Sequence, residues 1–420
     1  MNILYVNHYA GSPALGMEYR PFYLAREWVR LGHCVQMLAA DFSHVRSRQP
    51  AAGDQLIDGI QYRWYATPGY EGNGVARARN IWSFLRAVWA DSPRLVADFK
   101  PDVVIASSTY PMDIWVARRI ARSAGAKLVF EVHDLWPLSP IELSGMFHRH
   151  PFAVLCQHAE DEAYRHADVV VSMLPKVHAH MASRGLDLSK LHIVPNGIAL
   201  DEWQADPEPL RDDVAAALAS ARAGGRVVVG YAGSMGRPNA LDDLLDAAEL
   251  LRDEAFSFVL VGGGHEQARL AQRVAQAVQV SGAQAEHGAG VKAAHSAGVQ
   301  ATHGARAKAA HGAGVQAALS AVGQPQVQML PAVPKSQVPA FLAALDIAYI
   351  GWQRMPLYRF GIAPNKLMDY MMARCPVLHA VEAGNDPVAE AGAGISVAPE
   401  SAVAVAEGLR RLAAVPSAEG

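Results

Sequence analysis

A proline, an asparagine and a lysine stand together at positions 364–366, and Asp369 follows one helical turn later. Pro364 fits the first position of a helix, because its missing N–H would have no intrahelical partner there. The free N–H groups that follow, and the positive end of the helix dipole, favour an anion. This pattern predicts that Asn365 and Lys366 hold a diphosphate and that Asp369 binds a ribose diol. A surface helix with a local Lys–Asp pair is the alternative.

Two glycine-rich turns follow predicted strands. GYAGSMGR places Gly233 at a strand end with Arg237 shortly after it, and FVLVGGGHE places Gly263 directly after an apolar run. Glycine lets the backbone pass close to a ligand or turn sharply. We expect Gly233 and Gly263 to contact a phosphorylated ligand and Arg237 to reach a phosphate, with plain tight turns as the alternative.

His133 ends a predicted strand in FEVHDLWP, just before a proline-bearing loop. Ligands of open α/β sheets bind at the carboxyl ends of the strands, so a catalytic His133 is a reasonable hypothesis beside a purely structural one. We find no DxD motif after a strand, and we interpret HRH at 148–150 and HAH at 178–180 as surface histidines. No metal or other cofactor is expected.

Short apolar runs alternate with helical patterns along the whole chain, as in NILYV, a glycine-containing loop, YRPFYLAREWVRLGH and CVQMLAA. Strand, loop, helix and strand in this order form the βαβ unit of a parallel sheet. The alternation stops in a polar stretch near residue 205 and then restarts. We therefore predict two doubly wound Rossmann-like domains, 1–205 and 206–400, facing a central cleft, with a C-terminal helix and tail at 401–420.

The bulk composition is that of a globular protein: 420 residues, 51% hydrophobic and 18% charged, with a formal net charge of −3. A charge so close to zero argues against a nucleic-acid partner. The three cysteines, Cys34, Cys156 and Cys375, have neither disulfide-framework nor zinc-site spacing, which fits a reducing cytoplasm. The sequence shows no signal-peptide pattern, and no apolar run approaches the roughly 20 residues needed to span a bilayer.

One segment breaks the alternation, at about 280–323, where an eight-residue repeat is marked by His287, His295, His303 and His311. Eight residues advance a helix by about 800°, so successive histidines would spiral around it instead of forming one metal-binding face. We interpret the segment as a low-complexity insertion in the second domain whose deletion spares the core function.

Arginines and tryptophans alternate in VARARNIWSFLRAVWADSPRLVADFK, residues 75–100. An amphipathic helix of this kind can lie on anionic lipid. The alternative is a core-packing helix with a solvated basic edge.

The order and spacing of EVHDLWP, VPNGI, GYAGSMG, FVLVGGGHE and PNKLMDYMMARCPVL resemble a retaining glycosyltransferase of family 4 with the GT-B fold. The resemblance covers nearly the whole chain except the repeats. The N-terminus, ILYVNHYAGSPALGMEYRPFYLAREW, is similar to bacterial surface-polysaccharide transferases of the N-acetylfucosamine transferase type, which act in O-antigen assembly.

The resemblance implies a role for several residues. The loop with Gly11 and Gly16 would close over the donor phosphates or the acceptor, and His133 would lie near the transferred sugar. Asn196 and Gly197 would form an interdomain hinge. Lys366 would hold the diphosphate and stabilise the leaving group, and Asp369 would bind the ribose.

This sequence departs from the family pattern in three places. The family has an acidic pair, but here only Asp369 is present and Gly361 stands at the first position. Ala363 replaces a helix-capping hydroxyl, worth roughly 1 kcal/mol. The chain also ends without the helix that usually crosses back onto the first domain, so we expect weaker domain closure.

The expected function is transfer of a sugar, including the N-acetylated amino sugar class, from a nucleoside-diphosphate donor, expected to be UDP-linked. The expected acceptor is lipid-linked or a saccharide, in bacterial surface polysaccharide biosynthesis. The protein would be cytoplasmic, with peripheral contact to the inner face of the plasma membrane. A nucleotide-sugar 2-epimerase of the same fold and a non-catalytic sugar-nucleotide-binding protein are the alternatives.

Overall fold

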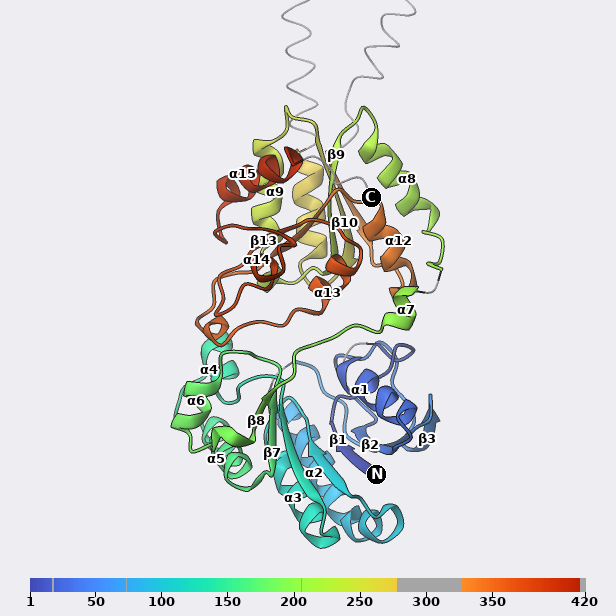
Figure 1. Cartoon of the computed structure of the whole chain (residues 1–420), viewed down its shortest axis with the longest axis vertical. Helices are drawn as coiled ribbons and strands as arrows, with labels where there is room; N and C mark the ends of the chain where they lie inside the picture. The colour runs from blue at the N-terminus through green and yellow to red at the C-terminus, as the bar shows by residue number, and fades with distance from the viewer. Residues whose placement is uncertain (17–18, 73, 205, 278–325, 416–420) are drawn as a thin grey trace, which may run out of the picture. The chain divides into compact units, whose positions relative to one another are not determined.

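The structure, a computed structural model, describes residues 1–16, 19–72, 74–204, 206–277 and 326–415 (Figure 1). The chain forms two compact units. The first contains Met1–Gly197, Met355–Ala363 and Ala383–Asn385, and the second contains Ile198–Arg354, Pro364–Glu382 and Asp386–Gly420. Along the chain, the first crossing between units therefore follows Gly197, whereas the sequence analysis placed the boundary at residue 205. The expected repeat insertion at 280–323 lies outside the described residues.

The first unit is built on an eight-stranded sheet in the order β3-β4-β2-β1-β5-β6-β7-β8. Every pairing is parallel except β3 with β4. The strands are β1 (Asn2–Val6), β2 (Cys34–Ala40), β3 (Gly53–Ile57), β4 (Ile60–Tyr65), β5 (Val103–Ala106), β6 (Lys127–Val132), β7 (Val169–Ser172) and β8 (Leu191–Ile193). The helices are α1 (Tyr19–Arg30), α2 (Val75–Arg94), α3 (Asp113–Ala124), α4 (Leu138–Ser144), α5 (Pro151–His166) and α6 (His178–Ser183).

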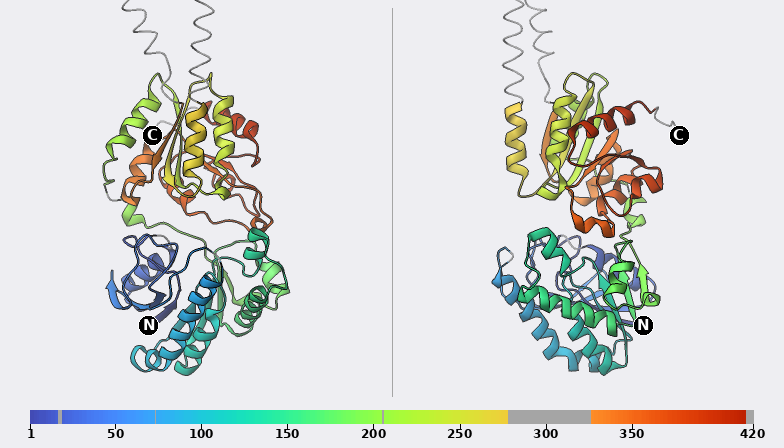
Figure 2. Two further views of the ribbon diagram at one scale, coloured as in Figure 1. Left: turned by 180° about the vertical axis from the view of Figure 1, so that it is seen from behind. Right: turned by 90° about the vertical axis from the view of Figure 1, so that its left-hand side faces the viewer.

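Alternation along the strands gives this sheet two buried faces. In β1, Leu4 and Val6 join the core under α2, α3 and α5, while Ile3 and Tyr5 join the core under α1. Figure 2 shows α2, α3 and α5 lying side by side along one face. A sheet covered on both faces explains why its strands read as nearly continuous apolar runs in the sequence.

The second unit has a six-stranded, fully parallel sheet in the order β11-β10-β9-β12-β13-β14. Its strands are β9 (Val227–Ser234), β10 (Phe256–Gly263), β11 (Val327–Pro331), β12 (Ile347–Gly351), β13 (Val377–Ala380) and β14 (Gly394–Ser396). Its helices include α7 (Leu200–Gln204), α8 (Asp212–Arg222), α9 (Leu241–Leu250), α12 (Val338–Ala343), α13 (Asn365–Met372), α14 (Pro387–Ala391) and α15 (Ala402–Ala413). Helices α9 and α15 pack together on one side of the sheet, and α8 lies on the other (Figure 1).

These two sheets confirm the predicted pair of Rossmann-like units. The sequence analysis did not identify the β3–β4 hairpin. Asp58 and Gly59 form its two-residue turn, with φ of 48° and 80°, and an Asp-Gly pair at positive φ is typical of a type I′ turn.

Candidate functional site

Helix α13 begins at Asn365 in the second unit. Pro364 precedes the helix in an extended conformation, with φ −71° and ψ 126°, so the prediction that it is the first helical residue is off by one. No side chain caps this end of the helix. Leu367 and Tyr370 are buried and anchor the helix on the unit's core, as the predicted stripe requires.

Lys366 points from the first turn of α13 toward β9. Its Nζ donates to the Tyr231 hydroxyl at 2.9 Å and to Asn239 Oδ1 at 3.0 Å. The ammonium also lies 4.3 Å from the centre of the Tyr231 ring. Among the hydrogen bonds and ion pairs of the described residues, both partners of Lys366 are neutral, and burial lowers its pKa to about 7. A cation held without a counter-ion is suited to binding an anionic ligand.

Gly233 leaves the space that Lys366 occupies. It ends β9 with a φ of 147°, and a Cβ there would lie 3.2 Å from Lys366 Nζ. The neighbouring glycines at the end of β10 differ in role. A Cβ on Gly262 would lie 1.9 Å from the Gly233 carbonyl oxygen, whereas the nearest atom to a Cβ on Gly263 is Gln267 Oε1 at 3.8 Å. Gly262 therefore permits close backbone packing, whereas a Cβ on Gly263 would make only an ordinary van der Waals contact.

Asp369 lies one turn beyond Lys366 but has a partner of its own. Trp203 Nε1 in α7 donates to Asp369 Oδ1 at 3.2 Å. Burial raises the pKa of this carboxyl. The alternative of a simple Lys366–Asp369 surface pair is not what the structure shows, because the two side chains have separate partners. Asn365 is the first residue of α13, and it is exposed.

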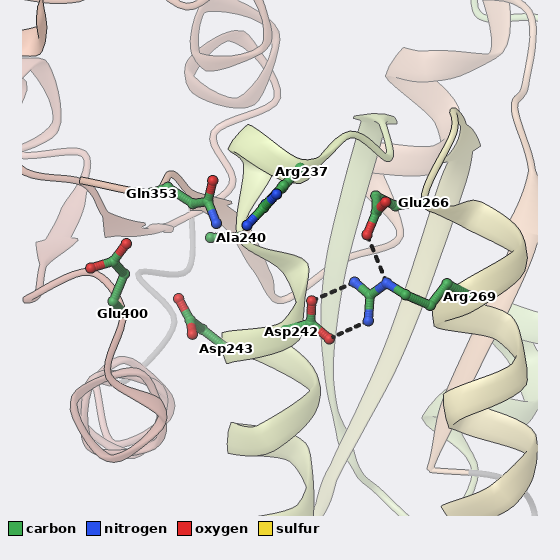
Figure 3. A pocket seen from close by; sticks show the side chains of 8 residues that line it. All are labelled: Arg237, Ala240, Asp242, Asp243, Glu266, Arg269, Gln353 and Glu400. Atoms are coloured by element: carbon green, nitrogen blue, oxygen red, sulfur yellow. Dashed lines mark hydrogen bonds and ion pairs between the residues drawn. The ribbon is translucent and has the colours of Figure 1, made fainter. Parts of the chain in front are cut away.

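Arg237 lies in a different environment from Lys366. Figure 3 shows it at the edge of a pocket of about 400 Å³. The pocket is lined by Arg237, Ala240, Asp242, Asp243, Glu266, Arg269, Gln353 and Glu400. Arg269 pairs with Asp242 at 2.5 Å and with Glu266 at 2.7 Å. Four carboxylates against two guanidinium groups make this pocket unfavourable for a diphosphate, so a phosphate role for Arg237 stays a prediction that the local charge opposes.

His133 is the centre of a buried polar network in the first unit. Its Nε2 lies 2.9 Å from Ser107 Oγ and 3.5 Å from Glu131 Oε2. Glu131 also accepts hydrogen bonds from Arg20 and Tyr5. Burial opposes ionisation of Glu131, but His133, Arg20 and Tyr5 together hold its pKa well below the usual value. The network therefore contains a buried carboxylate that stays ionised.

The predicted hinge residues lie at the end of the first unit's long segment. Asn196 Oδ1 accepts from Arg20 Nη1 at 3.2 Å, and Asn196 Nδ2 donates to the Ala363 carbonyl at 2.8 Å. Gly197 is the last residue before the chain enters the second unit. Whether Asn196 and Gly197 act as a hinge stays a prediction.

The predicted glycine loop follows β1. The Gly11 carbonyl accepts from the Tyr62 hydroxyl at 2.8 Å. Gly16 has a φ of 111°, and a Cβ there would lie 2.8 Å from the Ser47 backbone nitrogen. Gly16 is thus required by the packing of the loop, and its part in binding phosphates or acceptor stays a prediction.

Gly361, which stands where the family pattern has its first acid, belongs to the first unit. Its φ is 91°, and a Cβ would lie 2.6 Å from Pro175 and 2.9 Å from Asn385 Oδ1. The local backbone therefore excludes a carboxylate at this position, because any side chain would collide with Pro175 and Asn385.

Several residues of these sites were missed by the sequence analysis: Tyr5, Arg20, Ser107, Glu131, Tyr231 and Asn239. Glu131 had a detectable signal, since a charged residue next to the last position of a buried strand calls for partners. No cluster of histidine, cysteine and carboxylate side chains suited to a metal occurs in the described part of the chain. Within that part, no helix is long and apolar enough to cross a membrane.

Residues 16–197 match the protein family described as glycosyl transferase 4-like domain. Comparison with curated protein sequences found no match. This match lies within the first unit, so the first unit is similar to a glycosyl transferase 4-like domain over most of its length.

Solved structures resemble nearly the whole chain. Sucrose-phosphate synthase from Thermosynechococcus elongatus has a TM-score of 0.63 and 14% identity, covering 99% of this chain and 91% of that one. HepE from Anabaena, in complex with UDP and glucose, has a TM-score of 0.56 and 13% identity, covering 99% and 90%. A trehalose-6-phosphate structure from E. coli, bound with UDP-2-fluoro glucose, has a TM-score of 0.62 and 12% identity, covering 98% and 91%.

At these identities the structural likeness establishes the fold, and the chain has the predicted GT-B fold. Together with the domain match, the fold supports a glycosyltransferase of the GT4 type. The narrower resemblance to N-acetylfucosamine transferases stays a prediction.

Proposed function

We propose that this protein is a retaining glycosyltransferase that uses a nucleoside-diphosphate sugar, with UDP as the nucleotide. The observation that carries the proposal is Lys366, a buried ammonium with neutral partners at the start of α13, beside the glycine at the end of β9. Structural neighbours bound to UDP and glucose or to UDP-2-fluoro glucose favour UDP as the nucleotide.

In the proposed reaction the bond between the anomeric carbon and the diphosphate breaks, and negative charge grows on the departing oxygen. A donor fixed near that oxygen binds the transition state more strongly than the substrate. Lys366 and the first N–H groups of α13 are such donors, and they supply positive charge without a metal ion. Asp369 accepts from the ribose hydroxyls, and His133 contacts the transferred sugar.

The proposed acceptor is a lipid-linked or saccharide chain of bacterial surface polysaccharide, with an N-acetylated amino sugar as one class of transferred group. The proposed location is the cytoplasmic side of the plasma membrane. This part of the proposal is based on the sequence resemblance and on the surface of α2 described below.

The proposal is tested at Lys366. We expect Lys366→Ala to lower kcat by about 10²–10³, as loss of one oxyanion donor does, and to abolish the rise in Tm that UDP gives the wild type. Thermal-shift screening across nucleoside diphosphates and their sugars identifies the ligand, and product analysis measures turnover.

Lys190→Met is the matched control, because Lys190 also donates to an uncharged partner, the Ala167 carbonyl at 3.1 Å, but in the first unit. It should keep both readouts near wild type. Retained turnover in the Lys366 variant would remove its assigned role. Turnover of the sugar nucleotide without any acceptor would favour an epimerase, and binding without turnover would favour a non-catalytic binding protein.

Helix α2 supplies the proposed membrane contact. At 100° per residue, Val75, Arg79, Trp82, Arg86 and Trp89 share one face. Trp82 is 52% exposed and Trp89 46%. The opposite face packs in the core through Ile81, Phe84, Leu85 and Val88, so the core-packing alternative describes that face alone.

The exposed face of α2 combines aromatic rings with positive charge. Arg79 and Arg86 are exposed on it, and Arg119 of α3 lies 4.6 Å from the centre of the Trp89 ring. Arg77 differs, because its Nε donates to the Tyr9 hydroxyl at 3.2 Å. Tryptophan with arginine suits the headgroup region of an anionic bilayer.

We expect the wild type to float with vesicles that contain anionic lipid and not with neutral vesicles. Trp82→Ala with Trp89→Ala should reduce the bound fraction at least about fivefold, because each ring contributes a large buried apolar area. Leu31→Ala, at a residue 71% exposed on the loop after α1, is the control and should float as the wild type does. Absence of wild-type binding to either vesicle would contradict the proposal.

A further inference from the structure

Asp369 is held by a tryptophan from another helix. Trp203 Nε1 in α7 donates to Asp369 Oδ1 at 3.2 Å, across 166 positions of the sequence. The indole nitrogen can only donate, so the direction of this hydrogen bond is fixed. Among the described residues, no other group donates to the Asp369 carboxylate. Oδ1 is therefore anchored, whereas Oδ2 has no donor within the described part of the chain.

The second oxygen of Asp369 is accessible to a ligand. Asp369 is partly exposed, and Oδ2 is not one of the fully buried, unpartnered side-chain atoms of the described residues. Burial raises the pKa of this carboxyl, and the donation from Trp203 opposes the rise. An ionised carboxylate only accepts, and Oδ2 offers two lone pairs to the hydroxyls of a bound sugar.

Helix α7 has a second contact that holds it in place. Glu202, next to Trp203, accepts from Lys335 Nζ at 2.9 Å, which ties α7 to the turn before α12. Two neighbouring residues of α7 thus contact two different segments of the second unit. The position of the indole therefore does not depend on Asp369 alone, and a helix held in this way can orient the carboxylate.

We propose that Trp203 is a positioning residue of the nucleotide site: it fixes the plane of the Asp369 carboxylate and leaves Oδ2 to accept from a ribose hydroxyl. This role rests on the nucleoside diphosphate proposed above, in which Asp369 touches the ribose and Trp203 acts through Asp369. A carboxylate that is already oriented loses less conformational freedom when the ligand binds. Trp203 thereby favours a ribonucleotide over a nucleotide that lacks the hydroxyl.

The hydrogen bond can be observed in the ligand-free full chain. In ¹H–¹⁵N spectra of protein labelled with [¹⁵N]tryptophan, each of the eight tryptophans gives one indole signal, and Trp203→Phe assigns that of Trp203. We expect Asp369→Ala to move this signal upfield, because the proton loses a charged acceptor. A Trp203 signal that stays in place would overturn the proposal.

The role in binding is measured with UDP, 2′-deoxy-UDP and 3′-deoxy-UDP. We expect the wild type to prefer UDP over at least one deoxy analogue by about tenfold or more, as loss of a hydrogen bond to a charged group requires. Trp203→Phe keeps an aromatic ring without the N–H, and it should reduce this preference at least about threefold. A purely structural role would weaken all three ligands equally, and an unchanged preference would therefore refute the proposal. Tighter UDP binding would also refute it, because the indole would then compete with the ribose.

Asp369→Asn gives a second test that does not need Trp203→Phe to fold. The indole donor turns the amide oxygen toward itself, which places the NH₂ group at the position of Oδ2. Because this group cannot accept from a hydroxyl, the preference for UDP over the deoxy analogue should disappear. A preference that survives in Asp369→Asn would contradict the proposed geometry.

Trp64→Phe is the matched control. Trp64 Nε1 also donates to a side-chain oxygen, Gln55 Oε1 at 2.9 Å, but in the first unit. Its substitution should leave both the Trp203 signal and the preference for UDP as in the wild type.

These measurements separate the inference from the proposed function. A wild type that binds no nucleoside diphosphate would contradict the proposed function, and the role of Trp203 would fall with it, even with the hydrogen bond observed. A wild type that binds UDP, with the same ribose preference in Trp203→Phe, would refute the role of Trp203 alone.

Discussion

Burying the ammonium of Lys366 without a counter-charge is unfavourable in the free protein, but the same ammonium favours binding of an anionic ligand. Burial of its ammonium lowers the pKa to about 7, and its partners, Tyr231 and Asn239, offer no compensating charge. A diphosphate supplies that charge, so the bound state favours the protonated lysine and raises its pKa again.

This coupling predicts a pH dependence of binding. Below pH 7 Lys366 is already protonated in the free protein, whereas above pH 7 binding must take up a proton. The affinity for a UDP-sugar should therefore fall as pH rises, approaching about tenfold per pH unit above the lysine pKa. Calorimetry at pH 6.5 and 8.5, in buffers of different ionisation enthalpy, measures both the affinity and the proton uptake.

Lys366→Arg is the control for this experiment, because a guanidinium stays protonated throughout and should remove the proton uptake. A wild type whose affinity is flat between these two pH values would contradict the predicted coupling.

At the level of residues, the sequence indicated which side chains could bind a ligand, but it did not indicate which residues contact those side chains. Lys366 and Asp369 were identified because a proline, a lysine and an acid at helical spacing carry a local signal. Their partners, Tyr231 and Trp203, lie far away along the chain, and only the packing of α13 against β9 and α7 brings them near. Tyr5, Arg20 and Glu131 were missed for the same reason.

At the level of elements, the two glycines at the end of β10 have separate functions. Gly262 lies opposite Gly233 in the paired strands and has no room for a Cβ, whereas Gly263 has room. Both are glycines in one GGG run, so the sequence alone could not distinguish a glycine required by packing from one with room for a Cβ.

This difference predicts opposite outcomes for two similar variants. Gly262→Ala should lower the free energy of unfolding by about 1–3 kcal/mol, because its Cβ collides with the backbone of β9. Gly263→Ala should leave stability near wild type but weaken UDP binding if the ligand passes over this turn. Thermal unfolding and calorimetry on both variants check the pair. Equal stability of the two proteins would contradict the structural assignment.

The elements themselves were largely predictable. Buried parallel strands such as β1 and β9 are short apolar runs between helices, and this pattern identified both units. The exception was the β3–β4 hairpin, whose strand β3 is mostly exposed and so lacks an apolar run. Its Asp58-Gly59 turn was the available signal.

At the level of the whole molecule, the chain does not divide at one point. Residues 355–363 lie between segments of the second unit in sequence, yet Leu357 and Phe360 belong to the core of the first. The backbone of Lys176 donates to the Phe360 carbonyl at 2.9 Å, and Arg359 pairs with Glu142 at 2.7 Å. Sequence periodicity could not reveal this exchange, because a short segment of this kind has no repeat of its own.

The exchange predicts where a core substitution acts. Phe360→Ala should cost about 3–5 kcal/mol and speed amide hydrogen exchange in the first unit, including β7 and α6, while β9 and β10 keep their protection. Leu342→Ala, at a buried residue of α12, is the matched control and should affect the second unit instead. Faster exchange in β9 and β10 for the Phe360 variant would contradict the assignment.

The dispersed make-up of the first unit has a practical consequence for building chimaeras with relatives. A recombinant that exchanges everything after residue 197 for the corresponding half of another enzyme also replaces Leu357, Phe360 and Ala363. The core of the retained first unit would then contain side chains from the other enzyme at these positions. A graft that preserves the native residues at 355–363 and 383–385 keeps that interior intact, while the imported part brings its own specificity.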